Sequence, residues 1–221
     1  MTRTTAKIAA LAFCLGASGV ANAGFYYSTA SGAPDSSLGL YTINGPGTGY
    51  NDFGAQLASV GVTQYYLGTS LAVDGPGTIT FSLMGKEAGY TNQLLYGGST
   101  VLTTSGVSDS VWNTWGTTSN YSVGSGLLDF SFLAVNTGQS LSNAQNNATT
   151  GNSWLSIGIY IVDATTAWLL WDDSGAGPDD NHDDMIVKVT YTSVPEPATS
   201  LLFGLGLVGM GLAMRRRRSI G

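Results

Sequence analysis

The sequence predicts an all-β protein, built as an antiparallel β-sandwich or jelly-roll-like domain. Apolar and polar residues alternate in several short runs, which is the pattern of half-buried strands. Turn signals rich in glycine and proline separate these runs, and the only helical stretch, around residues 52–60, is weak. Many short strands divided by such turns are typical of antiparallel sandwiches.

Each predicted strand directs alternate apolar side chains to one face. The run Leu155, Ile157, Ile159 and Ile161 is the clearest case. Residues 136–153 contain almost no apolar side chain, which predicts a long exposed loop. The other strand runs are residues 78–83, 128–132 and 185–191, and the turn signals are residues 44–47, 74–77, 96–98 and 175–178.

The N-terminus has the order of a secretory signal peptide. Arg3 and Lys7 form a basic segment, residues 8–20 are apolar, and Ala21-Asn22-Ala23 is a small-residue cleavage site. We therefore expect residues 1–23 to be removed after Ala23 and the rest of the chain to be exported.

The predicted secreted domain, residues 24–194, is acidic and has no cysteine. It holds thirteen Asp and Glu residues against Lys86 and Lys188, which disfavours nucleic acid as a partner because such binding needs a basic patch. The single cysteine, Cys14, lies in the leader, and the bulky Phe13 before it disfavours a lipoprotein site there. The domain is thus expected to use no disulfide, although its compartment would permit one.

The C-terminal tail predicts a membrane helix. Residues 199–214 carry no charge and would form a helix about 24 Å long, a little short of a hydrocarbon core of about 30 Å. The basic stop that follows places the C-terminus in the cytoplasm and the domain outside. Pro195 and Pro197 keep the segment before the helix extended. The basic stop comprises Arg215, Arg216, Arg217 and Arg218.

This tail resembles the PEP-CTERM sorting signal of Gram-negative bacteria. The recognition motif would be Pro195, Glu196 and Pro197, followed by the apolar helix and the arginines, so that the signal spans residues 195–218. The resemblance implies an exosortase as partner, with its catalytic residues in that enzyme, in cells that make exopolysaccharide. It implies a transient anchor in the inner membrane, then the cell surface or extracellular space. A plain C-terminal anchor is the alternative.

A second candidate site is an acidic stretch between two apolar runs. Closely packed carboxylates repel unless water or a cation screens them, and Ca²⁺ takes six to eight such oxygens. The stretch lacks the EF-hand order, and a solvated acidic loop is an equal alternative. It also resembles a hairpin of PEP-CTERM and related bacterial surface proteins, which implies an association with calcium. Its candidate ligands are Asp172, Asp173, Asp179, Asp180, Asp183 and Asp184.

We expect no enzyme and no cofactor beyond this candidate calcium. His182 is the only histidine, whereas zinc catalysis usually needs several His or Cys ligands, and no nucleophile with a positioned base is evident. The expected role is structural or adhesive, among exopolysaccharide. One alternative is a carbohydrate-binding module for a specific glycan, with a tryptophan as its stacking platform. A secreted glycoside hydrolase is a weaker alternative, because the carboxylates outside the acidic stretch have no motif context.

Overall fold

The computed structural model describes residues 23–29, 39–43, 52–143, 145, 155–173, 181–194 and 206. Residues Asn22–Val194 form one compact unit. Within the described ranges, no helix is both long and apolar enough to cross a membrane. The elements are β1 (Phe25–Ser28), β2 (Gly39–Thr42), α1 (Gly54–Ser59), β3 (Gln64–Leu67), β4 (Ser70–Val73), β5 (Gly77–Gly85), β6 (Asn92–Tyr96), β7 (Ser99–Thr103), β8 (Gly116–Thr117), β9 (Tyr121–Val123), β10 (Gly126–Leu127), β11 (Phe130–Ala134), β12 (Gln139–Ser142), β13 (Ser156–Asp163), β14 (Thr166–Asp172) and β15 (Met185–Ser193).

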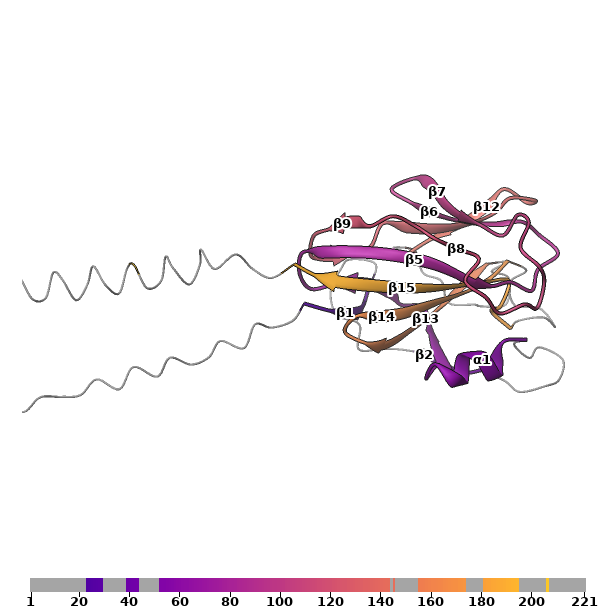
Figure 1. The fold of residues 1–221 in the computed structure, drawn as a ribbon, viewed down its shortest axis with the longest axis horizontal. Helices are drawn as coiled ribbons and strands as arrows, with labels where there is room; N and C mark the ends of the chain where they lie inside the picture. Colours follow the sequence, from indigo (N-terminus) through magenta and orange to yellow (C-terminus); the bar gives the residue numbers. More distant parts are fainter. Residues whose placement is uncertain are drawn as a thin grey trace, which may run out of the picture. The chain divides into compact units, whose positions relative to one another are not determined.

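The described strands form three antiparallel sheets. The largest has the order β2-β3-β13-β14-β15-β5-β8, with β9 also paired to β5. A second sheet has the order β12-β11-β6-β7, and a third the order β1-β4-β10. Figure 1 shows β6, β7 and β12 on one side of β5 and β15, with α1 on the other side. The prediction of an antiparallel all-β protein is confirmed, and the jelly-roll arrangement stays a prediction.

The inner face of the large sheet carries the main core. One row of paired residues crosses four neighbouring strands, from Ile159 through Leu169 and Val187 to Leu83, and all four side chains are buried. Side chains from the other two sheets join the same cluster, among them Leu71 and Phe132. The alternation predicted for residues 78–83 is confirmed, because β5 has alternate residues buried along its whole length.

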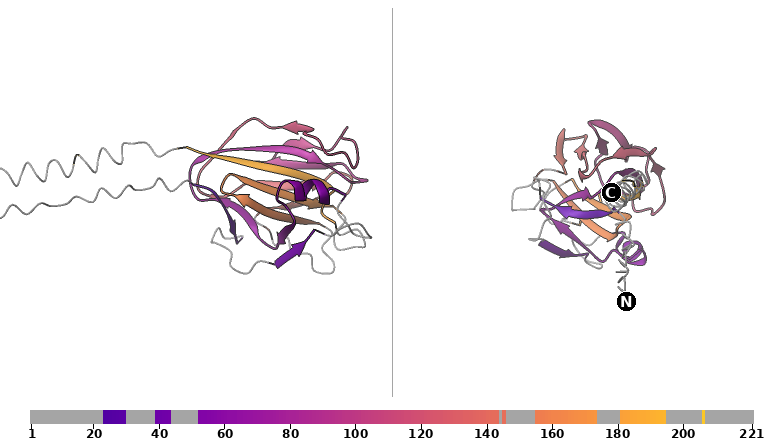
Figure 2. Two further views of the ribbon diagram at one scale, coloured as in Figure 1. Left: turned by 60° about the horizontal axis from the view of Figure 1, so that its bottom comes forward. Right: turned by 90° about the vertical axis from the view of Figure 1, so that its left-hand side faces the viewer.

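The outer face of the large sheet is covered as well. Its next row runs from Gly158 through Leu170 and Ile186 to Gly85. Leu170 and Ile186 are buried in a second cluster that includes residues in and beside α1, which lies over these strands in Figure 2. Because both faces of β14 are covered, this strand reads as a continuous apolar run, without alternation.

Two glycines make room for the aromatic rings that cover this face. A Cβ atom on Gly158 would lie 2.6 Å from the ring of Tyr65, and one on Gly85 would lie 2.8 Å from the ring of Phe53. Such distances are too short for real carbon contacts, so any side chain here would displace a ring. The close approach of the backbone to these rings therefore requires glycine at both positions.

The expected exposed loop at residues 136–153 is wrong in its first part. Residues 139–142 form β12, which pairs with β11, and Asn143 after it is buried. The Asn143 side-chain amide donates to the carbonyls of Leu71 and Leu128, and its oxygen accepts from the Leu71 N–H. A polar residue here is thus a buried connector between two sheets, which composition alone does not reveal. Residues 146–153 lie outside the described part.

Candidate functional site

The acidic stretch lies at one end of the large sheet, where β14 ends and β15 begins. Asp172 closes β14 and Asp173 follows it, while Asp183 and Asp184 come directly before β15. Since the two strands pair antiparallel, with Trp171 opposite Met185, the two acidic pairs lie at the same end of the sheet.

These four aspartates are buried, so for them the solvated-loop alternative is wrong. Asp172 and Asp183 expose 0% of their surface, and Asp173 and Asp184 only 4% and 6%. A carboxylate loses its hydration on burial and needs hydrogen bonds or a cation in compensation. The site is therefore part of the domain interior.

One half of the site is a hydrogen-bonded connection between three segments of the chain. Asn92, at the start of β6, donates from its amide nitrogen to Asp173 Oδ2 at 2.6 Å. Its amide oxygen accepts from the Trp171 ring N–H at 3.2 Å. The Asp173 N–H in turn donates to Asp184 Oδ2 at 2.6 Å. Asn92 and these aspartates thereby join β6 to the ends of β14 and β15.

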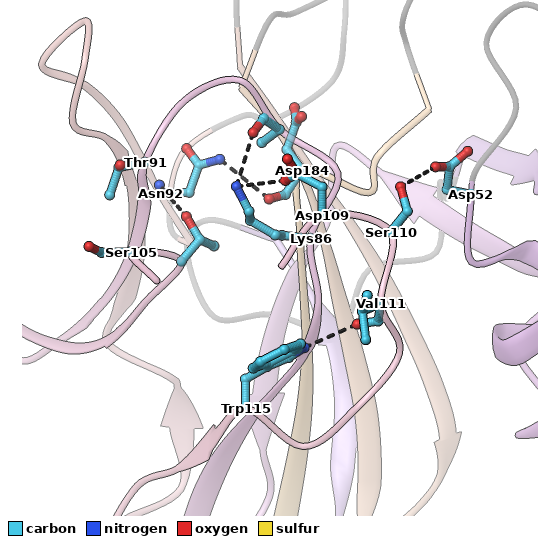
Figure 3. A network of polar contacts seen from close by, with 12 residues as sticks. Asp52, Lys86, Thr91, Asn92, Ser105, Asp109, Ser110, Val111, Trp115 and Asp184 are labelled. Atoms are coloured by element: carbon cyan, nitrogen blue, oxygen red, sulfur yellow. Dashed lines mark hydrogen bonds and ion pairs between the residues drawn. The ribbon is translucent and has the colours of Figure 1, made fainter. Parts of the chain in front are cut away.

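The other half centres on Asp183. Its Oδ2 accepts from the Asp52 N–H at 2.6 Å, and its backbone carbonyl accepts from the Glu87 N–H at 2.8 Å. The Asp52 carboxylate accepts from the Ser110 hydroxyl at 2.6 Å (Figure 3). Asp183 therefore connects the segment before α1 to the segment that follows β5.

Three carboxyl groups meet closely enough to share one cation. Glu87, Asp183 and Asp184 each place one oxygen within 4.8 Å of the others. Calcium–oxygen distances of about 2.3–2.6 Å allow two ligands on opposite sides of one ion to lie about 4.6–5.2 Å apart. The three oxygens thus fit within one calcium coordination sphere, and Glu87 is a member that the sequence did not identify.

The electrostatics of this cluster oppose ionisation of Asp184. Burial raises the pKa of its carboxyl group to about 9, and the neighbouring carboxylate of Asp173 raises it further, with smaller contributions from Asp172 and Asp183. The hydrogen bond from the Asp173 N–H lowers this pKa but does not reverse the effect. A positive charge would have the opposite effect, since an opposite charge nearby favours the ionised form.

His182 is fully buried beside the aspartates and serves the interior. Its Nε2 lies 2.6 Å from the Ser156 hydroxyl and its Nδ1 lies 3.1 Å from the Tyr65 hydroxyl. Burial lowers the pKa of the ring to about 3, so it is neutral at physiological pH. Its φ of 57° is left-handed, which histidine adopts more readily than most residues. Because both Ser156 and His182 are 0% exposed, this pair holds the corner together and does not face solvent.

Several predicted residues lie outside the described part of the structure. They are Ala21, Asp179, Asp180, Pro195, Glu196, Pro197, Arg215, Arg216, Arg217 and Arg218. Conversely, the structure adds Asp52, Glu87 and Asn92 to the acidic corner. These three come from separate segments with no shared spacing, so no sequence pattern marked them.

The tail is decided by its match to a known family. Residues 193–218 match the family model of the PEP-CTERM protein-sorting motif. The chain carries a PEP-CTERM sorting motif. The resemblance in the tail is thereby confirmed, and the motif indicates an exported surface protein that an exosortase sorts. No curated protein matches the chain.

Proposed function

We propose that the β domain of this exosortase-sorted protein has a structural or adhesive role among exopolysaccharide at the cell surface. The observation that carries the proposal is the PEP-CTERM motif at residues 193–218, because it directs the domain to the surface. The PEP-CTERM resemblance, which implies cells that make exopolysaccharide, supports the matrix setting. The buried polar corner offers no solvent-facing nucleophile and base among the described residues, which favours this role over a hydrolase.

The N-terminal end of the domain supports export with cleavage after Ala23. Gly24, which would begin the mature chain, donates its N–H to Asp74 Oδ1 at 2.5 Å. Cleavage would turn this N–H into a charged α-amino group beside a carboxylate, and charge-assisted hydrogen bonds of this kind are stronger than neutral ones. The folded domain is therefore suited to an N-terminus at residue 24.

Replacing Pro195, Glu196 and Pro197 together by alanine tests the sorting step. The exosortase should no longer recognise the tail, and the full-length protein should accumulate uncleaved in the membrane. Immunoblots of membrane, surface and culture fractions measure this. Replacing Thr199 by alanine, just outside the motif, is the matched control and should be processed normally. Wild-type release of the triple variant would contradict the proposal.

We also propose that the acidic corner binds Ca²⁺ and that the ion stabilises the domain. Glu87, Asp183 and Asp184 would supply the described ligands, and Asp179 and Asp180 are candidates from the same stretch. The support is the meeting of three carboxyl oxygens within 4.8 Å, from two segments of the chain, in a buried corner. An ion there would connect the segment after β5 to the start of β15.

A second candidate function is the binding of a specific glycan. It is favoured by a groove that opens between the edge strands of the two largest sheets. The glycan role would give the structural role a molecular basis, since a domain held in a polysaccharide matrix needs contacts with it.

A further inference from the structure

A groove of about 490 Å³ lies between β7, an edge strand of the four-stranded sheet, and β8, an edge strand of the large sheet. Small-molecule sites in proteins typically have volumes of about 300–1,000 Å³. The residues at its base, Leu83 and Leu102, are buried and belong to the main core. The groove is thus a gap where the two sheets diverge above their shared core.

The residues around this base are polar and uncharged. Four hydroxyl side chains line the rim and are exposed, and none of the described residues lining the groove is ionisable. Each hydroxyl has one donor and two acceptor positions, so one internal hydrogen bond leaves capacity for a ligand. The lining therefore suits a neutral ligand rich in hydroxyl groups. The rim hydroxyls belong to Thr100, Thr103, Ser105 and Thr117.

Trp115 supplies an aromatic wall. Its ring N–H donates to the Val111 carbonyl at 3.0 Å, and its backbone N–H donates to the Leu83 carbonyl at 2.9 Å (Figure 3). The indole is half-buried and packs against the main core. Since its polar atom is already bonded within the protein, the ring offers the groove an apolar surface in a fixed orientation. Little conformational entropy is lost when a ligand stacks on such a ring.

We propose that this groove binds a neutral saccharide, whose apolar ring face stacks on Trp115 while its hydroxyl groups bond to the threonine and serine rim. The proposal rests on the proposed function and names the ligand class and the site through which the domain would contact a matrix. A sugar ring presents C–H groups on its face and hydroxyls at its edge, which complements a lining of one indole, an apolar base and a hydroxyl rim.

The edges of the groove disfavour an extended peptide as its occupant. A peptide would add to an exposed strand through a regular series of backbone hydrogen bonds. The pairing of β7 with β6 is interrupted by a register shift between Leu94 and Leu95, and β8 is only two residues long. Bulged and short edges pair poorly with added strands. The geometry thus favours side-chain recognition of a compact ligand.

The test is binding of the purified full-length protein, in detergent, to an array of neutral and anionic oligosaccharides. Dissociation constants are then measured by calorimetry on the best neutral glycan. Trp115→Ala should weaken binding about tenfold or more, because it removes the apolar stacking surface. Trp115→Phe, which keeps an aromatic face, should weaken binding less. Thr117→Val keeps the shape, loses a rim hydroxyl, and should also weaken binding.

Tyr90→Ala is the matched control, because Tyr90 is an exposed aromatic residue outside the groove. It should leave the dissociation constant unchanged. If Trp115→Ala does not fold, as judged by its melting curve, Trp115→Phe and Thr117→Val carry the test. The proposal is overturned if no neutral glycan binds, if only anionic glycans or extended peptides bind, or if these variants bind like the wild type.

The same variants separate this proposal from the proposed function. Trp115→Phe and Thr117→Val should still be cleaved and reach the surface, because the sorting motif is untouched. Normal sorting without glycan binding would overturn the saccharide site alone. A wild-type protein that is not sorted would overturn the proposed function.

Discussion

Calcium should stabilise this protein through Glu87, and Glu87→Gln should abolish the effect. In the absence of calcium, two ionised carboxylates within 4.8 Å of each other repel by at least about 3.5 kcal/mol at an effective dielectric constant near 20. Glutamine keeps the size of the side chain and removes one of these charges. The variant should therefore melt at a higher temperature than the wild type in chelator, and should gain nothing from calcium.

The size of the calcium effect follows from linkage. An ion that binds only the folded state adds RT ln(1 + [L]/Kd), or about 2.7 kcal/mol at a hundredfold excess over Kd. At roughly 2–4 °C per kcal/mol for a domain of this size, the melting temperature should rise by roughly 5–10 °C. Magnesium should have a smaller effect, because it demands tight octahedral geometry and keeps its waters.

The assay is thermal unfolding of the full-length protein in detergent, followed by circular dichroism, with millimolar Ca²⁺, Mg²⁺ or chelator. Asp109→Asn is the matched control. Its carboxylate pairs with Lys86 at 2.7 Å on the surface and does not belong to the cluster, so this variant should keep the calcium shift. The variant with Asp179, Asp180, Asp183 and Asp184 all changed to Asn should lose it.

Coincident wild-type melts in calcium and chelator would refute the calcium site. A wild-type shift that Glu87→Gln leaves intact would refute the part assigned to Glu87 and leave the ion to the hairpin itself.

Three further predictions concern the tail, the outer face and the alkaline limit of stability. Replacing Arg215 to Arg218 by neutral residues should weaken membrane retention, because nothing then opposes translocation of a short apolar helix; unchanged fractionation and protease protection would contradict this. Gly158→Ala should destabilise the domain by about 1–3 kcal/mol in denaturant unfolding, because the new Cβ would displace Tyr65, whereas Gly89→Ala, with no atom near its Cβ position, should cost far less. Burial raises the pKa of the Tyr27 hydroxyl, which also accepts a hydrogen bond from the Ile161 N–H. Its contribution to stability is therefore complete below about pH 10, where the unfolded side chain begins to ionise, and is lost as the pH rises further. Tyr27→Phe should flatten this alkaline decline, and an equally steep decline in the variant would count against the assignment.

Two features of this protein are determined by the sequence itself, because each depends on residues adjacent in the chain. The alternation in residues 78–83 reports one covered face of a strand, and β5 has that pattern of burial. The tail motif is likewise a local order of residues, and its family match spans residues 193–218. Neither feature needs knowledge of which distant segments meet.

Tertiary structure alone decided the character of the acidic corner and of the groove. Six clustered aspartates predict a calcium hairpin and a solvated loop equally well, since composition does not say what covers them. Asn92 bonds Asp173 across 81 positions of the chain, and Glu87 meets Asp183 and Asp184 from the segment after β5. The groove similarly needs two sheet edges, β7 and β8, to diverge above Leu83 and Leu102. Contacts between segments so far apart leave no periodic trace in the sequence, so burial, charge clustering and the groove appear only when the strands are paired in space.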